Sequence, residues 1–185
     1  MTMPMTEGDP IPSPDITVSS REDQQSHRAR TVAVILSTIG LVVAIDQATK
    51  AVVADWLGSS DFARRWELAG RYLAFEYVEN TGAAFGILAG RTWLLSLLAL
   101  VVGCWFVAAY LEQLPFSVTL QVAVGLVLGG ALGNLIDRVR LGYVVDFLAV
   151  GIWPRFNVAD SAITIGLLLL FVTVLRDDPR GSAKA

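Results

Sequence analysis

Cysteine and histidine are nearly absent from this sequence, which has one of each among its 185 residues. Cys104 lies alone in an apolar segment, so it cannot form an internal disulfide, and a small buried hydrophobe is favoured over a nucleophile. His27 lies in a polar stretch near the N-terminus. A transition-metal site or a Ser-His-Asp triad needs more of these side chains than the chain supplies, so we expect neither.

Runs of basic residues are also missing. The 14 Lys and Arg and the 17 Asp and Glu are spread over the two ends and the loops, and the formal net charge is −3. A protein that follows a phosphate backbone needs clustered positive charge, so nucleic acid is not expected as a partner. In contrast, 54% of the residues are apolar, which is more than is usual in soluble domains. This composition predicts an integral membrane protein.

Four apolar runs follow a polar tail. Residues 1–27 contain four prolines and five acids and are predicted to be disordered, because they cannot bury enough apolar surface to become ordered. Residues 92–111 and 116–136 are uncharged and long enough to cross a membrane as helices, which takes about 20 residues. The first and last runs are shorter, so each must include a neighbouring acid, Asp46 or Asp160, in order to span. The predicted membrane domain is 28–176, with spans near 30–49, 92–111, 116–136 and 157–175 and a C-terminal tail at 177–185.

Helices that alternate in direction would place the polar groups of this domain on one side of the membrane. Asp46 ends the first span, residues 134–138 end the third and Asp160 begins the fourth. Two segments between the spans, "RYLAFEYV" (71–78) and "GYVVDFLAV" (142–150), are rich in aromatic and β-branched residues, as strands are. We therefore predict a small sheet at the membrane interface.

Asp146 and Asp160 have no basic residue at helical spacing, and Arg155 is the only base between them. Two carboxylates that meet in a poorly hydrated site cannot both ionise easily, so they would share a proton near neutral pH, as in aspartic proteases. One would then activate a water molecule and the other would support the developing oxyanion. Spacing alone leaves a second interpretation equally open, in which the acids serve a proton or cation pathway.

Other polar residues of the domain have structural interpretations beside functional ones. Lys50 follows Asp46 by four residues, which is the spacing of a helical ion pair. Asn134, Asp137 and Arg138 share one helical face, and the arginine should keep Asp137 ionised, which suits an organiser of the site better than a proton-transfer group. A stripe of small residues that favours close helix packing is formed by Gly125, Gly129 and Gly133.

Five motifs occur in order along the chain: "DQATK" (46–50), "ENTGAAFG" (79–86), "GGALGNLIDRV" (129–139), "VVDF" (144–147) and "FNVADSAITIG" (156–166). Together they closely resemble the lipoprotein signal peptidases, the bacterial signal peptidase II family, over about residues 31–175. The resemblance implies an aspartic endopeptidase that removes signal peptides from prolipoproteins, cutting before a cysteine that carries a diacylglyceryl group, with no metal or other cofactor. The implied fold is an all-α integral membrane protein with four transmembrane helices and a small extracytoplasmic β-sheet.

The resemblance also implies roles for individual residues. The catalytic aspartates fall on Asp146 and Asp160. Asparagines can orient a carboxylate or bind a substrate backbone without adding charge, which suits a site with one shared proton. Expected partners are lipid-modified prolipoproteins and membrane lipid, and the protein is expected to be monomeric. The residues implied to support the site or contact substrate are Asp46, Asn80, Asn134, Asp137, Arg138 and Asn157.

The sequence gives a weaker indication of the side of the membrane on which the candidate site lies. The side with the candidate site carries eight Lys and Arg residues against six on the other, which argues against an outward-facing site. Around the first span, Arg21, Arg28 and Arg30 precede it and Lys50 closely follows, which favours a cytoplasmic N-terminus. We follow the first span and the resemblance, and expect cytoplasmic termini and a site on the outer face of the inner membrane. Two non-enzymatic alternatives are a small proton-conducting transporter, which the uncharged middles of the spans argue against, and a scaffold that binds lipidated peptides.

Overall fold

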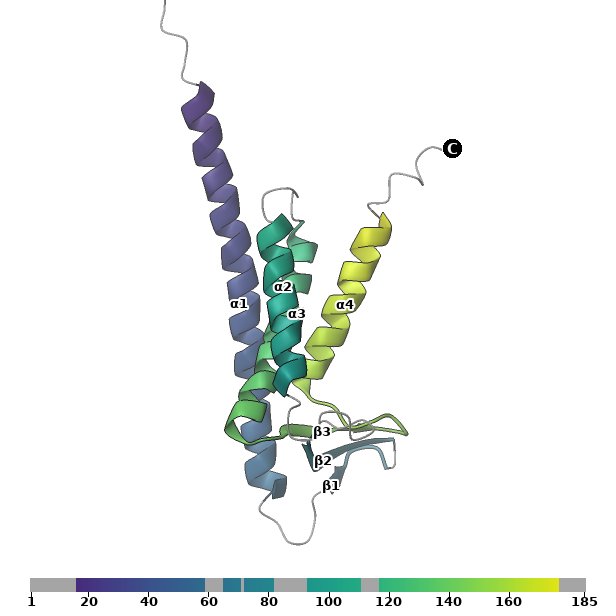
Figure 1. Ribbon diagram of the computed structural model, residues 1–185. Coiled ribbons are helices and arrows are strands. Elements are labelled where there is room, and N and C mark those ends of the chain that lie inside the picture. Colours follow the sequence, from purple (N-terminus) through teal and green to yellow (C-terminus); the bar gives the residue numbers. More distant parts are fainter. Residues whose placement is uncertain (1–15, 59–64, 71, 82–92, 111–116, 177–185) are drawn as a thin grey trace, which may run out of the picture.

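The computed structural model describes residues 16–58, 65–70, 72–81, 93–110 and 117–176. Within these ranges the chain is mostly helical and contains one small antiparallel sheet. Figure 1 shows α1 and α4 diverging from the end of the molecule at which the sheet lies, with α2 and α3 between them. The elements in chain order are α1 (Ile16–Gly58), β1 (Arg65–Glu67), β2 (Leu73–Asn80), α2 (Trp93–Tyr110), α3 (Val118–Arg140), β3 (Val144–Val150) and α4 (Val158–Arg176).

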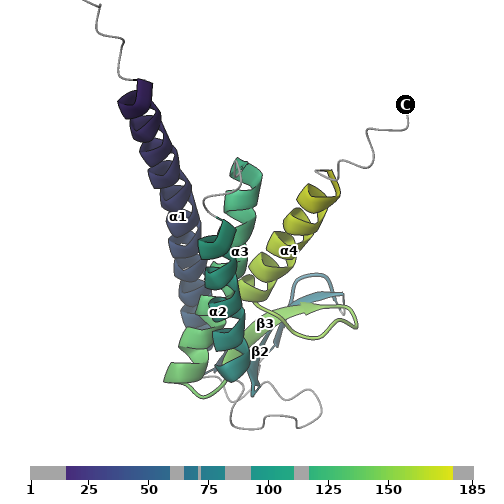
Figure 2. The same cartoon turned by 45° about the horizontal axis from the view of Figure 1, so that its top comes forward.

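Helix α3 packs against each of the other three helices, and both views place it among them (Figures 1 and 2). Its glycines allow these close approaches. A Cβ atom at Gly125 would lie 2.6 Å from a side-chain carbon of α1, and one at Gly133 would lie 2.7 Å from Oδ2 of Asp46. A Cβ atom at Gly130 would clash with the backbone oxygen of Ala159 at the start of α4. The packing role predicted for the glycine stripe is therefore confirmed.

Helix α1 is longer than the expected span at both ends. It begins at Ile16 and so includes residues 16–27, which the composition assigned to a disordered tail. No proline lies between Pro14 and Pro115, so this stretch has no residue that would stop a helix. At the other end the helix continues past residue 49 to Gly58, where it meets the sheet.

The sheet has the strand order β1-β2-β3, and both strand pairs are antiparallel. Strands β2 and β3 fall within the two segments predicted as strands, apart from the last two residues of β2, which confirms that prediction. The three-residue strand β1 was not predicted, because it is too short to show an alternating pattern. Cross-strand pairs join it to β2: Arg65 bonds to Glu76 at 3.0 Å, and Trp66 stacks on Phe75.

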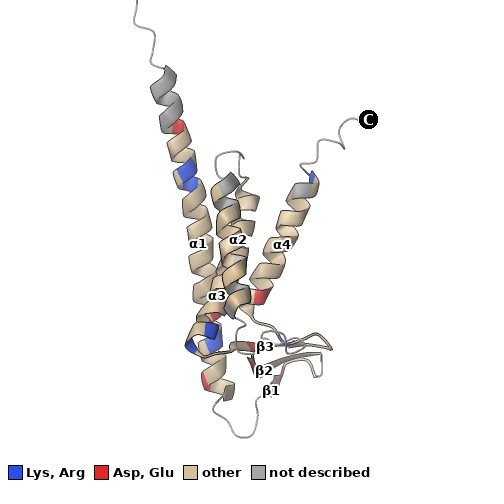
Figure 3. Ribbon diagram, viewed as in Figure 1, with Lys and Arg blue, Asp and Glu red and all other residues tan. Residues whose placement is uncertain are grey.

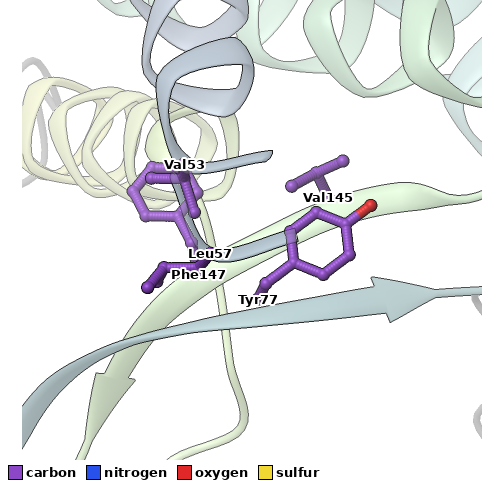
Figure 4. Close-up of a cluster of buried hydrophobic side chains, with 5 residues drawn as sticks. All are labelled: Val53, Leu57, Tyr77, Val145 and Phe147. Carbon is purple, nitrogen blue, oxygen red and sulfur yellow. The ribbon is translucent and has the colours of Figure 1, made fainter. Parts of the chain in front are cut away.

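A hydrophobic cluster packs the end of α1 against the sheet and determines the direction in which the side chain of one candidate acid points. Its buried members are Val53, Leu57, Tyr77, Val145 and Phe147 (Figure 4). Successive side chains of a strand point to opposite faces. Because Val145 and Phe147 face this cluster, Asp146 between them points to the other face of β3.

In the part of the chain that the structure describes, two helices are long and apolar enough to cross a membrane, Asp23–Gly58 within α1 and the whole of α3, while the apolar part of α4 is shorter. Large apolar side chains are exposed along the helices, among them Leu41, Leu98, Trp105 and Phe171. Charged residues lie towards the helix ends and on the sheet (Figure 3). Such surfaces favour helices surrounded by lipid rather than water. Helices occupy all four predicted spans, and the crossing of the membrane by all four stays a prediction.

Candidate active site

The structure brings all eight candidate residues together where the helices meet the sheet. Five elements contribute to this site: α1, β2, α3, β3 and α4. Asp146 lies on β3, Asn80 is the last residue of β2, and Asn157 immediately precedes α4. The remaining members lie on helices: Asp46 on α1, Asn134, Asp137 and Arg138 on α3, and Asp160 on α4.

Asp146 is buried, with 2% of its surface exposed, and both of its carboxylate oxygens accept hydrogen bonds. Nδ2 of Asn157 donates to Oδ1 at 2.7 Å, and Nδ2 of Asn80 donates to Oδ2 at 2.8 Å. Asn80 reaches Asp146 diagonally across the sheet, because the direct partner of Asp146 is Val78. Burial raises the pKa of Asp146 to about 6; repulsion from Asp160 adds to the rise, and the two asparagines limit it.

Asp160 lies in the first turn of α4, where the helix dipole favours negative charge, and it is partly exposed. Its Oδ1 accepts a hydrogen bond from Nδ2 of Asn134 at 2.8 Å, and its Oδ2 accepts the backbone N–H of Asn157 at 3.3 Å. In return, Oδ1 of Asn157 accepts the backbone N–H of Asp160 at 2.9 Å. This reciprocal pattern is that of a capping box, so the start of α4 itself fixes the Asp160 side chain.

Asn157 connects the two aspartates. It is completely buried, and its Nδ2 donates to Asp146 and, at longer distances, to Oδ1 of Asn134 (3.2 Å) and the backbone oxygen of Val145 (3.4 Å). The sequence predicts Asn157 as the first residue of the fourth helical span, near 157–175. It lies instead just outside the helix, as its cap, and from there its side chain reaches β3.

A buried ion cluster lies behind the two aspartates. Nζ of Lys50 lies 2.8 Å from Oδ2 of Asp46 and 2.8 Å from Oδ2 of Asp137. The Asp46–Lys50 ion pair predicted from helical spacing is thus confirmed, and Asp137 joins it from α3. Oδ1 of Asp46 also accepts the backbone N–H of Ala159 at 2.9 Å, which ties α1 to the first turn of α4.

Two arginines lie close in sequence to the aspartates and have different surroundings. Arg138 is half-buried, its Nη1 donates to the backbone oxygen of Asn134 at 3.3 Å, and its positive charge interacts with Asp160, Asp146 and Asp137. Arg155 forms a 2.8 Å salt bridge with Glu76 of β2, so its charge is directed to the sheet.

Lys50 and Gln47 belong to the site but were not singled out as site residues from the sequence. Besides its two carboxylate partners, Lys50 donates to Oδ1 of Asn134 at 3.1 Å. Nε2 of Gln47 donates to Oδ1 of Asp137 at 2.8 Å. Two features of the sequence could have identified them: both residues belong to the "DQATK" motif, and a lysine without a partner in an apolar segment is energetically costly. Among the residues that the structure describes, no group of three or more His, Cys, Asp or Glu could hold a metal ion.

Known proteins resemble this chain in sequence and in fold. The family model of signal peptidase (SPase) II matches residues 38–176. A lipoprotein signal peptidase of Moorella thermoacetica is 43% identical over 130 residues, which are 70% of this chain and 85% of the relative. One from Rhodococcus jostii is 39% identical over 166 residues, which are 86% and 80% of the two chains. A bacterial membrane enzyme solved at 2.3 Å by the in meso method has a TM-score of 0.68 and 32% identity, over 83% of this chain and 94% of that one.

Proposed function

The chain belongs to the lipoprotein signal peptidase (signal peptidase II) family, proteases that remove signal peptides from prolipoproteins, and we propose that it acts as an aspartic endopeptidase with Asp146 and Asp160 as its catalytic pair. One observation carries the proposal. Each of the four oxygens of these carboxyl groups accepts an N–H from an asparagine, and the three asparagines are Asn80, Asn134 and Asn157. Neutral donors of this kind hold two acids in place without adding positive charge at the carboxyl oxygens, where it would drive off a shared proton.

The different surroundings of the two aspartates support different roles. Burial raises the pKa of Asp146 to about 6, so about one tenth of the free enzyme carries a proton on Asp146 at pH 7, and we assign the active form to this fraction. Asp160 is partly exposed in the first turn of α4, where its carboxylate can meet the attacking water. In the proposed mechanism Asp160 is therefore the base and Asp146 the acid.

The reaction begins with a water molecule between the two carboxyl groups. Asp160 takes one proton from the water as its oxygen attacks the scissile carbonyl carbon, and Asp146 gives its proton to the carbonyl oxygen. In the resulting tetrahedral intermediate, Asp160 donates its proton to the leaving nitrogen and the C–N bond breaks. Asp146 recovers a proton from a hydroxyl as the carbonyl forms again. The products are a signal peptide with a new carboxyl end and a lipoprotein with a new amino end, and the pair returns to its initial protonation.

The proposed substrate is a diacylglyceryl-modified prolipoprotein, which is cut before the lipidated cysteine. The exposed apolar side chains of the helices suit contact with acyl chains, while the site lies at their polar end beside the sheet (Figure 3). We place four transmembrane helices in the inner membrane, with both termini cytoplasmic and the site on the outer side. Arg28 and Arg30 before the apolar part of α1 and Arg176 at the end of α4 support this orientation. Because one chain supplies all five elements of the site, a monomer suffices.

A proton or cation pathway is the rival function. It requires ionisable groups through the depth of the membrane. The middles of the four apolar runs are uncharged, and the candidate acids gather at one end of the helices. This distribution favours chemistry at the membrane surface over passage across it.

Cleavage by the purified protein in lipid vesicles tests the proposed function. We expect it to cut a diacylglyceryl-modified prolipoprotein and to leave the lipidated cysteine as the new N-terminal residue, which mass spectrometry of the product identifies. The matched control is the same prolipoprotein without the lipid, which should be cut much more slowly. No cleavage of the modified substrate, or cleavage at another bond, would overturn the proposal, and binding without cleavage would point to a scaffold.

A further inference from the structure

We infer that Lys50 is a positioning residue of the active site, which holds the side-chain amide of Asn134 in the one orientation that lets it donate to Asp160. The inference rests on the proposed catalytic pair. Lys50 is 3% exposed and comes from α1, whereas Asn134 comes from α3 and Asp160 from α4. The three residues form a chain of contacts: Nζ of Lys50 lies 3.1 Å from Oδ1 of Asn134, and Nδ2 of Asn134 lies 2.8 Å from Oδ1 of Asp160.

The ammonium group of Lys50 has three N–H donors and no acceptor. The structure provides three acceptors for them, Oδ2 of Asp46, Oδ2 of Asp137 and Oδ1 of Asn134. Two carboxylates are already more than enough to balance its charge. The contact with the amide of Asn134 is therefore not needed to neutralise Lys50, and its effect lies in the orientation of the amide.

That contact decides which way the amide of Asn134 points. An asparagine amide can turn over, which exchanges its oxygen and its NH₂ group, and its neighbours decide between the two states. Because an ammonium can only donate, the oxygen must face Lys50 and the NH₂ must face Asp160. The reversed amide would set NH₂ against the ammonium and oxygen against the carboxylate, which are two repulsive contacts. The 3.2 Å hydrogen bond from Asn157 to the same oxygen supports the same orientation.

The consequence for catalysis lies at Asp160. With Asn134 held in this way, both oxygens of Asp160 have an N–H partner, and its carboxylate is fixed in direction. Lys50 and Asn134 are both buried, so we do not expect a water molecule to replace the ammonium group as the donor to Asn134. The sequence feature behind this arrangement is the lysine that ends "DQATK".

The first test is cleavage of the modified prolipoprotein by Lys50→Met, which keeps the length of the side chain and removes its donors. We expect kcat to fall roughly 10- to 100-fold, the usual effect of losing a hydrogen bond to a charged group, with KM changed by less than about threefold. The matched control is Gln121→Met. Gln121 is also buried, and its Nε2 joins α3 to α1 by donating to Oγ1 of Thr31 at 3.3 Å, but it lies near the start of α3 and outside the site, so this variant should keep kcat within about threefold of the wild type.

A double-mutant cycle separates positioning from support of the fold. In an Asn134→Leu background, Lys50→Met should lower kcat by less than about threefold further, because its effect passes through Asn134. The full effect in that background would overturn the inference, as would a Lys50→Met enzyme of wild-type kcat. Should Lys50→Met not fold, Lys50→Met/Asp46→Asn keeps the net charge of the ion cluster and gives the same test. Failure of the wild type to cleave would instead refute the proposed function, so the two failures are distinct.

Discussion

Replacing Asp146 by Asn should change how the stability of the protein depends on pH. The pKa of Asp146 is about 6 in the folded protein and 3.8 without the fold. Below about pH 4 the residue is protonated in both the folded and the unfolded chain and costs nothing. Between about pH 4 and pH 6 the unfolded chain has lost the proton that the folded protein still holds, so the free energy of unfolding falls by 1.36 kcal/mol per pH unit, or about 3 kcal/mol in total, and it levels off above about pH 6.

Asparagine does not titrate, so the Asp146→Asn variant does not undergo this pH-dependent loss of stability. Its altered hydrogen bonds with Asn80 and Asn157 add an offset that does not depend on pH. We therefore expect the melting temperature of Asp146→Asn minus that of the wild type to increase by roughly 6–12 °C between about pH 4 and about pH 7.5. Thermal unfolding in detergent micelles, followed by circular dichroism at each pH, measures this difference.

The neighbours of Asp146 provide the control. Asp160, whose charge contributes to the raised pKa, can be replaced first, and in an Asp160→Asn background the pH-dependent difference should be smaller. A melting-temperature difference that stays flat from pH 4 to 7.5 would refute the assignment of the shared proton to Asp146.

Three further predictions concern packing, the helix cap and metal ions. Gly133→Ala places a Cβ atom 2.7 Å from Asp46 and should lower the free energy of unfolding by about 1–3 kcal/mol. In contrast, the Cβ atom of Gly40→Ala meets nothing within 4 Å, so this variant should be tolerated. Thermal unfolding compares the two variants, and equal stability would be evidence against the packing account. Asn157→Ser keeps a capping oxygen but loses the amide that donates to Asp146, so it should be about 1 kcal/mol more stable than Asn157→Ala and yet equally impaired in cleavage; a fully active serine variant would contradict the bridging role. Cleavage by the wild type should survive dialysis against a strong chelator, and a loss that added metal restores would point to another kind of hydrolase.

Much of the fold could be predicted from the sequence because its signals are local. Uncharged runs of helical length are found in α2 and α3, and aromatic and β-branched segments are found in β2 and β3. Other features depend on contacts that composition does not encode. Strand β1 is held by pairing with β2, and the start of α1 at Ile16 reflects the absence of a helix breaker rather than an apolar pattern.

The sequence names the candidate residues that the structure brings together, but it does not predict the contacts between them. Spacing left Asp146 and Asp160 open to two interpretations, and the five motifs selected one of them. The contact of Lys50 with Asn134 joins residues 84 positions apart, and that of Asn80 with Asp146 joins residues 66 apart. Such side-chain contacts depend on the packing of α1 against α3 and on the register of the sheet. No local pattern in the sequence specifies either of them.

The central claim is that Asp146 and Asp160 act together on a water molecule, and the rate of cleavage of a diacylglyceryl-modified prolipoprotein by Asp146→Asn and Asp160→Asn tests it most directly. Both variants keep the shape of the side chain, and circular dichroism shows whether they remain folded. Loss of a general acid or base typically slows a reaction by about 10²–10⁴, and each variant should be slowed at least that much while it still binds the substrate in vesicles. A folded variant of either aspartate that cleaves within about tenfold of the wild-type rate would contradict the account.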